Sequence, residues 1–105
     1  MHSYIVNASI QIVPLAQDRH PYLWVDEAIA IIEASGVRFE VGAFATVLEG
    51  THDAVMQVIS DVQEHLYQKG CAEWITSIQL QVRSSGDITG DEKTAKYQLA
   101  NLASW

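Results

Sequence analysis

Residues 4–13 alternate between side chains of two kinds. Apolar and polar residues take opposite sides of this segment: Val6, Ala8, Ile10 and Ile12 against Asn7, Ser9 and Gln11. Alternation with a period of two predicts a β-strand that buries one face. Pro14 cannot continue a hydrogen-bonded ladder and marks the end of the strand. Whatever the fold, it must cover one face of this strand and leave a second face of mixed character.

Two segments whose apolar residues have the spacing of a helix can cover the apolar face of this strand. The first begins at Pro21 and ends at Gly36, and the second begins at Thr51, a good capping residue, and ends at Lys69 and Gly70. Their apolar residues recur three or four positions apart: Val25, Ile29 and Ile32 in the first, and Val55, Ile59, Val62 and Leu66 in the second. Each segment is therefore predicted to be a helix with one buried stripe.

Three further strands complete the pattern. Val37, Phe39 and Val41 alternate with charged residues, an extended run follows from Phe44 to Glu49, and a fourth strand covers about Trp74 to Arg83. The order strand, helix, strand, strand, helix, strand is that of an α+β, ferredoxin-like βαββαβ sandwich with both helices on one sheet face. We expect a single domain over residues 1–105, with no linker.

A C-terminal helix is expected to follow these elements. Thr89 and Glu92 match a capping box, and Ala95, Leu99 and Leu102 form a short apolar stripe. Because a short helix is not stable alone in water, the stripe is predicted to dock against the body of the chain or against a neighbour.

Composition excludes several classes of function. Six basic and thirteen acidic residues give a net charge of −7, which argues against binding to a nucleic-acid backbone. The apolar runs are too short to span a membrane, and the N-terminus does not have the pattern of a secretory signal. A single cysteine, Cys71, cannot form an internal disulfide and is expected to be a small buried residue. These features favour a cytoplasmic protein.

The second face of the predicted sheet has an unusual mixture of residues. Ile5, Val13 and Ile75 lie there among amides and hydroxyls: Asn7, Ser9, Gln11, Ser77, Gln79 and Gln81. A partner subunit that covers this face would bury the apolar residues and pair the amides, which predicts a homo-oligomer. The alternative is an antiparallel sheet with one face in water.

Catalytic and metal-binding constellations are not evident. The four histidines do not have the spacing of metal ligands, no nucleophilic triad is ordered, and no glycine-rich phosphate loop is present. Glu49 is the most informative acid, because it ends an apolar strand beside Gly50. It either faces water, near the positive end of the following helix, or points at a ligand that needs a negative charge.

The ordered segments ASIQIVPL, EASGVRFEVGAFATVLEG, GCAEWITSIQLQVR and DEKTAKYQL resemble the thiamine-binding protein family, which includes the MTH1187 and YkoF-like proteins. The core signal is Ser-Gly before the second strand and Thr-x-x-Glu-Gly at the end of the third. Pro-Leu after the first strand, Arg83 closing the fourth, and Glu-Lys opening the last helix also fit. This chain departs from the pattern at five positions near the presumed pocket: Ala16, Ala43, Ala45, Gln79 and Val82.

The resemblance implies a non-catalytic cytoplasmic protein that binds thiamine or its hydroxymethylpyrimidine moiety and assembles through its sheets into dimers and tetramers. It implies no resident cofactor and no metal. A carboxylate and hydroxyls suit the polar edge of an aminopyrimidine, and an aromatic ring can stack on its face. The predicted ligand-binding residues are Glu49, Thr46, Phe44, Ser9 and Gln11.

Two observations keep alternatives open. Strand alternation places Glu49 on the face opposite to Phe44 and Thr46 unless the strand bulges or twists. The fold alone does not decide function either, so a small oligomeric enzyme and a regulatory interaction module remain the rival hypotheses.

Overall fold

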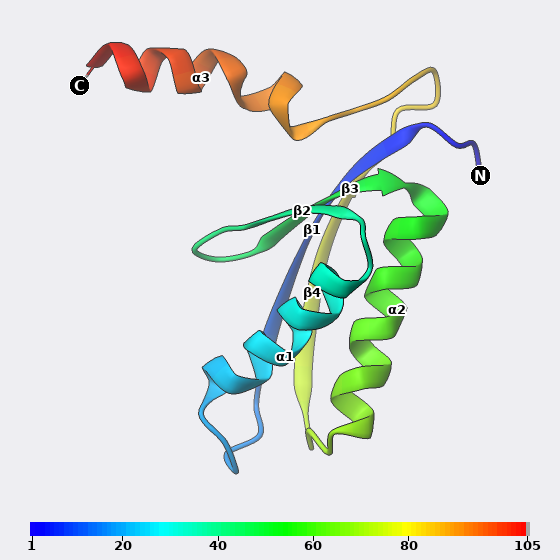
Figure 1. The fold of residues 1–105 in the computed structure, drawn as a ribbon, viewed down its shortest axis with the longest axis vertical. Coiled ribbons are helices and arrows are strands. Elements are labelled where there is room, and N and C mark those ends of the chain that lie inside the picture. Colours follow the sequence, from blue (N-terminus) through cyan, green and yellow to red (C-terminus); the bar gives the residue numbers. More distant parts are fainter. Residues whose placement is uncertain (105) are drawn as a thin grey trace.

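The computed structural model describes the backbone of residues 1–104 and the side chains of residues 1–97. Seven elements follow one another along the chain: β1 (Ile5–Pro14), α1 (Pro21–Ala34), β2 (Arg38–Val41), β3 (Thr46–Thr51), α2 (His52–Gln68), β4 (Trp74–Gln81) and α3 (Gly90–Ser104). Figure 1 shows α1 and α2 packed beside each other on the same side of the sheet, with α3 at one end of the molecule. The predicted order of elements is confirmed.

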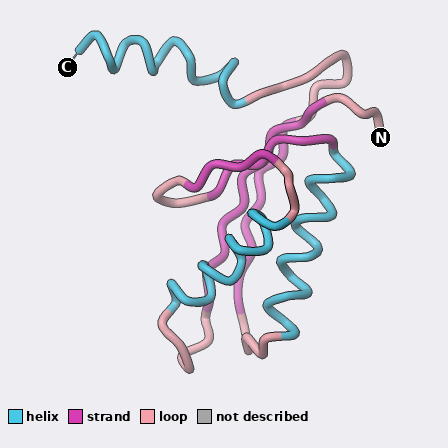
Figure 2. The backbone as a smooth tube through the Cα atoms, viewed as in Figure 1, coloured by secondary structure: helices cyan, strands magenta, loops and turns pink. Residues whose placement is uncertain are grey.

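The four strands form one antiparallel sheet in the order β2-β3-β1-β4. The first strand in the chain is therefore a central strand, paired with β3 on one side and with β4 on the other. This is the strand order of a ferredoxin-like sandwich, as predicted, and the backbone trace in Figure 2 shows the strands as one layer and the two helices as another.

The hydrophobic core lies between the sheet and the two helices. β1 and α2 contribute the core residues that their periodicity predicted, with Val58 in addition: Val6, Ala8 and Ile10 from β1, and Val55, Ile59, Val62 and Leu66 from α2. In α1 the prediction was only partly right, because the buried residues are Trp24, Ala28 and Ile32, whereas Val25 and Ile29 are half-buried. Leu48 of β3 and Cys71, before β4, complete the core. Cys71 is buried, as expected for a small core residue.

The helix ends follow the sequence signals closely. Gly36 and Gly70, which follow α1 and α2, have φ angles of 79° and 85°, a left-handed conformation that favours glycine. At the start of α2, the hydroxyl of Thr51 accepts a hydrogen bond of 3.2 Å from the backbone N–H of Ala54.

The third strand begins later than predicted. Phe44 was expected to open it, but β3 runs from Thr46 to Thr51 and Phe44 lies in the hairpin that joins it to β2. The N–H of Gly42 donates to the carbonyl of Ala45 across this hairpin, at 2.9 Å. The turn therefore takes up the residues from Gly42 to Ala45 and leaves the Phe44 side chain 85% exposed.

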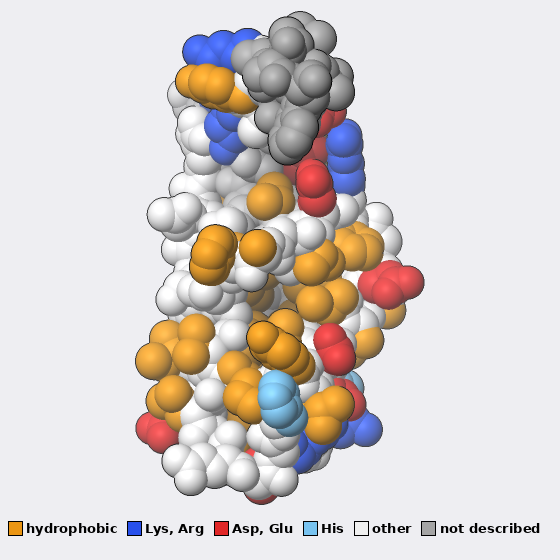
Figure 3. Space-filling view, turned by 90° about the vertical axis from the view of Figure 1, so that its left-hand side faces the viewer, with side chains coloured by type: hydrophobic (Ala, Val, Ile, Leu, Met, Phe, Trp, Pro, Cys, Tyr) orange, Lys and Arg blue, Asp and Glu red, His pale blue; other side chains and the backbone are white. Residues whose placement is uncertain are grey.

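Apolar side chains gather around this hairpin. Figure 3 shows hydrophobic side chains over the middle and lower part of the face toward which the hairpin projects. Three strongly exposed members come from the hairpin region and the start of α1: Val41, Phe44 and Tyr22. The molecule therefore carries an apolar surface on the helix side as well as the mixed face of the sheet.

The helix α3 leaves the body of the molecule. It begins above one end of the sheet and runs away from it (Figure 1), and residues 91–97 are exposed. Ala95, expected to dock, therefore does not pack against its own chain, whereas Leu99 and Leu102 lie outside the residues whose side chains are described. Thr89 caps the helix as predicted, because its hydroxyl accepts from the N–H of Glu92 at 3.2 Å. No helix within the described part of the chain is long and apolar enough to cross a bilayer.

A charged contact joins the two helices of the covering layer. Nε2 of His65, on α2, donates to a carboxylate oxygen of Glu27, on α1. This hydrogen bond is the main cause that holds the pKa of Glu27 below its ordinary value of 4.5, and the nearby charges of Lys69 and Arg19 act in the same direction. The ionised form of Glu27 is thus favoured by the fold.

We predict that Glu27→Gln lowers the free energy of unfolding at neutral pH, because the amide cannot form the charged pair. A carboxyl whose pKa is lowered by folding stabilises the fold above its unfolded pKa, and this stabilisation is lost as the pH falls through its folded pKa. The melting temperatures of the wild type and E27Q should therefore converge in acid. A constant difference from neutral to strongly acidic pH would show that the charge of Glu27 plays no part.

Candidate functional site

One row of polar side chains crosses the open face of the sheet. The strand registers place Arg38 of β2 opposite Glu49 of β3, Glu49 opposite Asn7 of β1, and Asn7 opposite Gln81 of β4. Residues directly opposite one another in antiparallel strands lie on the same face. The predicted acid at the end of β3 is therefore the centre of a row that all four strands supply.

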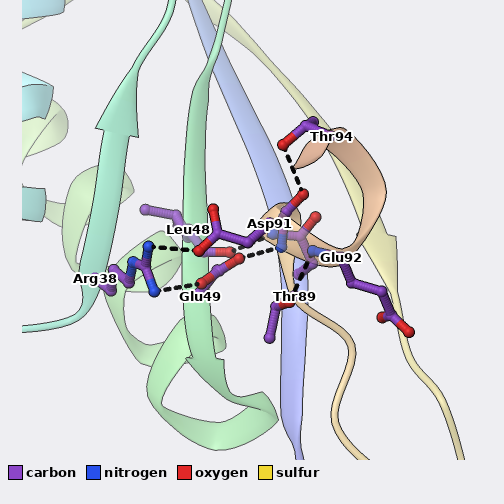
Figure 4. A network of polar contacts seen from close by, with 9 residues as sticks. Arg38, Leu48, Glu49, Thr89, Asp91, Glu92 and Thr94 are labelled. Carbon is purple, nitrogen blue, oxygen red and sulfur yellow. Dashed lines mark hydrogen bonds and ion pairs between the residues drawn. The ribbon is translucent and has the colours of Figure 1, made fainter. Parts of the chain in front are cut away.

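Glu49 does not face water. Its side chain is 11% exposed, one carboxylate oxygen accepts a hydrogen bond from the backbone N–H of Gly90, and the other lies 3.5 Å from Nη1 of Arg38. Figure 4 shows the carboxylate between the guanidinium of Arg38 and the first turn of α3. A carboxylate this far removed from water needs such partners, because an unpaired buried charge is strongly destabilising.

Arg38 and Asn7 extend this arrangement. Nη2 of Arg38 lies 3.2 Å from a carboxylate oxygen of Asp91, so one guanidinium bridges two acids (Figure 4). The buried amide of Asn7 donates to the carbonyl of Leu48 at 3.3 Å. Arg38 and Asp91 are largely exposed, at 68% and 71%, so this series of ion pairs extends from the shielded Glu49 to solvent.

A cavity of about 730 Å³ lies over this row. Its floor is the open face of the sheet, including Asn7, Ser9 and Glu49, and its opposite wall is the first turn of α3, with Gly90 and Lys93. The Lys93 ammonium donates to the side-chain oxygen of Gln81 at 2.9 Å and so ties this wall to β4. The volume lies in the range of pockets that enclose small molecules.

The structure brings together only part of the predicted ligand set. Glu49 and Ser9 line the large cavity, on the open face of the sheet. Phe44, Thr46 and Gln11 line a second, smaller cavity of about 240 Å³ beside α1 and the β2–β3 hairpin. Thr46 is buried opposite Ile10, on the helix side, so β3 has no bulge that would carry Thr46 to the same face as Glu49.

Sequence reasoning did not select four residues that shape the large cavity, namely Asn7, Arg38, Gly90 and Asp91. Asn7 was placed on the open face, but nothing local marked it as buried. Arg38 was recognised only as a charged position of a half-buried strand. Gly90 meets Glu49 across a separation of 41 residues, and no short-range pattern can reveal such a contact. Thr89 and Glu92, which mark the start of α3, were the nearest available signal.

The described residues contain no cluster of three or more His, Cys, Asp or Glu side chains arranged to hold a metal ion. The site is a cavity with a shielded carboxylate at its floor. The family model for thiamine-binding proteins matches residues 8–98, which include most of β1, the other three strands and the start of α3. The chain belongs to the thiamine-binding protein family.

Two relatives match this chain over most of its length. A UPF0045 protein of Clostridium perfringens is 36% identical over 92 residues, which cover 88% of this chain and 96% of that relative. A solved DUF77 domain of unknown function from Bacillus cereus superposes with a TM-score of 0.85 at 42% identity, over 90% of this chain and 91% of that one.

A third relative carries a functional name. A solved protein of Thermotoga maritima, provisionally named a thiamine biosynthesis/salvage protein, superposes with a TM-score of 0.80 at 29% identity. The similarity covers 89% of this chain and 98% of that one.

We predict that Glu49→Ala destabilises the protein more than Arg38→Ala. Removing the carboxylate leaves the Gly90 N–H without its acceptor, which should cost about 1–3 kcal/mol. Removing Arg38 leaves the Gly90 N–H on the carboxylate and takes away from Glu49 only a 3.5 Å pair with an exposed guanidinium, which should cost less than about 1 kcal/mol. Urea unfolding of both variants measures the difference. Equal effects, or a larger effect of R38A, would contradict the view that Glu49 organises the network.

Proposed function

We propose that this protein binds thiamine or its hydroxymethylpyrimidine moiety in the cavity over the open face of the sheet. The observation that carries the proposal is a carboxylate only 11% exposed on the floor of a 730 Å³ cavity, in a chain that belongs to the thiamine-binding family. The name of the Thermotoga maritima relative supports the same class of ligand.

The chemistry of the cavity suits an aminopyrimidine. Each oxygen of Glu49 has a second lone pair beyond the one used by Gly90 or Arg38, and can accept from an exocyclic amino group. The hydroxyl of Ser9, on the neighbouring strand, can donate to or accept from the ring edge. Phe44 and Thr46, which belong to the smaller cavity, do not contact this ligand in the proposal.

The proposed role is binding without catalysis, as a carrier, sensor or buffer. No histidine lines the large cavity among the described residues. Three acids of the described part of the chain line it, Glu40, Glu49 and Asp91, and two of them, Glu49 and Asp91, share the guanidinium of Arg38, which favours charge pairing over proton transfer. We place the protein in the cytoplasm, a reducing compartment that suits its one free cysteine.

We further propose that two copies pair through the open face of the sheet. Val13 and Ile75 lie opposite each other in the β1–β4 register and are 37% and 51% exposed. Gln79, which also lines the large cavity, lies on the same face and is exposed, so its amide can meet polar groups of a second copy in the ligand-free protein. Stacked sheets would bury the apolar pair and could give a dimer or a tetramer.

The ligand proposal predicts that Glu49→Gln weakens binding of thiamine and the pyrimidine alcohol. The loss should be about 1.5–3 kcal/mol, which corresponds to roughly 10–150-fold in Kd, because the charge-assisted hydrogen bond becomes a neutral one. Calorimetric titration measures it, with Glu33→Gln on the exposed side of α1 as the matched control. Equal affinities of E49Q and the wild type would refute a role for the carboxylate in binding.

The assembly proposal predicts that Gln79→Glu shifts the ligand-free protein toward smaller species. The variant would bury a carboxylate without a partner between the stacked sheets. Gln17→Glu introduces the same charge in the exposed loop before α1 and should leave assembly unchanged. Light scattering at micromolar concentration measures the mass. A monomeric wild type would remove the basis of this proposal.

A further inference from the structure

The segment that leads into α3 is fixed to the sheet at several points. We call residues 87–93 the entry segment. The carboxylate of Asp87 accepts from the N–H of Ile5 at 2.7 Å, and the N–H of Ile88 donates to the carbonyl of Ile5 at 3.0 Å. Ile88 is 2% exposed, so the segment is also held by burial of an apolar side chain. These contacts bring Gly90 to the end of the β3 strand.

Further ionic or polar contacts hold the residues that follow Gly90. Nη2 of Arg83, which follows β4, lies 3.2 Å from both carboxylate oxygens of Glu92. Asp91 is bound by Arg38 of β2, and Lys93 by Gln81 of β4. The entry segment is therefore attached to both edges of the sheet and forms the wall of the large cavity that faces Glu49.

Gly90 fits this position because it has no side chain. A Cβ atom built on Gly90 would lie 3.0 Å from Oε1 of Glu49, closer than ordinary van der Waals contact. Gly86, in the same connection, has nothing within 4 Å of the corresponding position, and neither glycine has a positive φ angle. The two positions thus differ in their contact with Glu49, which makes Gly86 a matched control.

We propose that the entry segment is part of the ligand site. The N–H of Gly90 positions the Glu49 carboxylate. A bound ligand in turn stabilises the contact between the start of α3 and the sheet. This inference rests on the proposed function for the identity of the ligand. The large cavity is lined by the sheet and by the entry segment, so a ligand in it would contact the sheet and the segment together. Gly90 and Arg38 each occupy one oxygen of Glu49 and thereby fix the direction of the remaining lone pairs.

The coupling follows from the exposure of α3. Residues 91–97 are exposed, so within the described side chains the helix is held mainly at its entry segment. A ligand that bridges the sheet and this segment stabilises the docked state by its preference for that state. The coupling is reciprocal, so docking of the segment on the sheet raises the affinity for the ligand by the same factor.

The test of positioning is a double-mutant cycle on ligand affinity. Gly90→Ala should displace the carboxylate by a few tenths of an ångström and raise the Kd for the pyrimidine alcohol by about tenfold. If Gly90 acts through Glu49, G90A combined with E49Q should bind no more weakly than E49Q alone. Gly86→Ala should bind as the wild type does. Additive losses in G90A and E49Q, or an equal loss in G86A, would overturn the proposal.

The test of coupling is hydrogen exchange of residues 90–97. In the ligand-free protein, G90A and E49Q should speed exchange across this range, and G86A should not. Saturating pyrimidine alcohol should slow exchange there in the wild type and less so in G90A. Unchanged or faster exchange on binding would overturn the coupling.

The two hypotheses fail in different ways. If no thiamine-like compound binds, the proposed function fails, and the ligand-free comparison still decides whether Glu49 holds the start of α3. If the ligand binds but the exchange of residues 90–97 does not respond, the proposed function stands and the present inference is wrong.

Discussion

Burial of one face of β1 is the constraint from which the rest of the structure follows. Val6, Ala8 and Ile10 are at most 3% exposed, and they are covered by α1 and α2. Because β1 is a central strand, its buried face fixes which side of β3 and β4 also faces the helices. The other side of the sheet then carries the polar row, and the large cavity lies over it.

The shielded position of Glu49 has a cost that the neighbouring elements offset. Taking a carboxylate out of water is unfavourable by several kcal/mol unless donors replace the lost hydration. Here a backbone N–H and a guanidinium do so, and they come from α3 and β2 on either side of the residue. An arrangement of this kind contributes little net stability, yet it holds a charged group in one place, which is what a binding site requires.

Local patterns in the sequence predicted the elements and missed the contacts between distant ones. The alternation in β1, the apolar stripe of α2 and the glycines after both helices were sufficient for the fold, because each depends on neighbours a few residues away. The start of β3 was misplaced because the turn from Gly42 to Ala45 is decided by its own hydrogen bond and not by hydrophobicity.

The site was predicted in the same uneven way. Strand parity placed Glu49 on the face opposite to Thr46 and Phe44 and placed Ser9 on the open face, and the structure has both Glu49 and Ser9 on the open face. The partners of Glu49 could not be predicted, because Arg38 reaches it through strand pairing and Gly90 through a connection that has no regular pattern. The burial of an acid near the end of a strand depends on the whole folded chain and not on the local sequence.

The crowding at Gly90 also limits how this chain can vary over time. A side chain at position 90 is disfavoured only while a carboxylate stands opposite it, so the two positions are constrained as a pair. A lineage that lost the acid would be released from the need for glycine and free to strengthen the start of α3 with a better helix-forming residue. Gly86, four residues earlier, carries no such constraint and can drift. Retention or loss of the acid at position 49 would thus be reflected in the residue at position 90, although glycine has no functional group of its own.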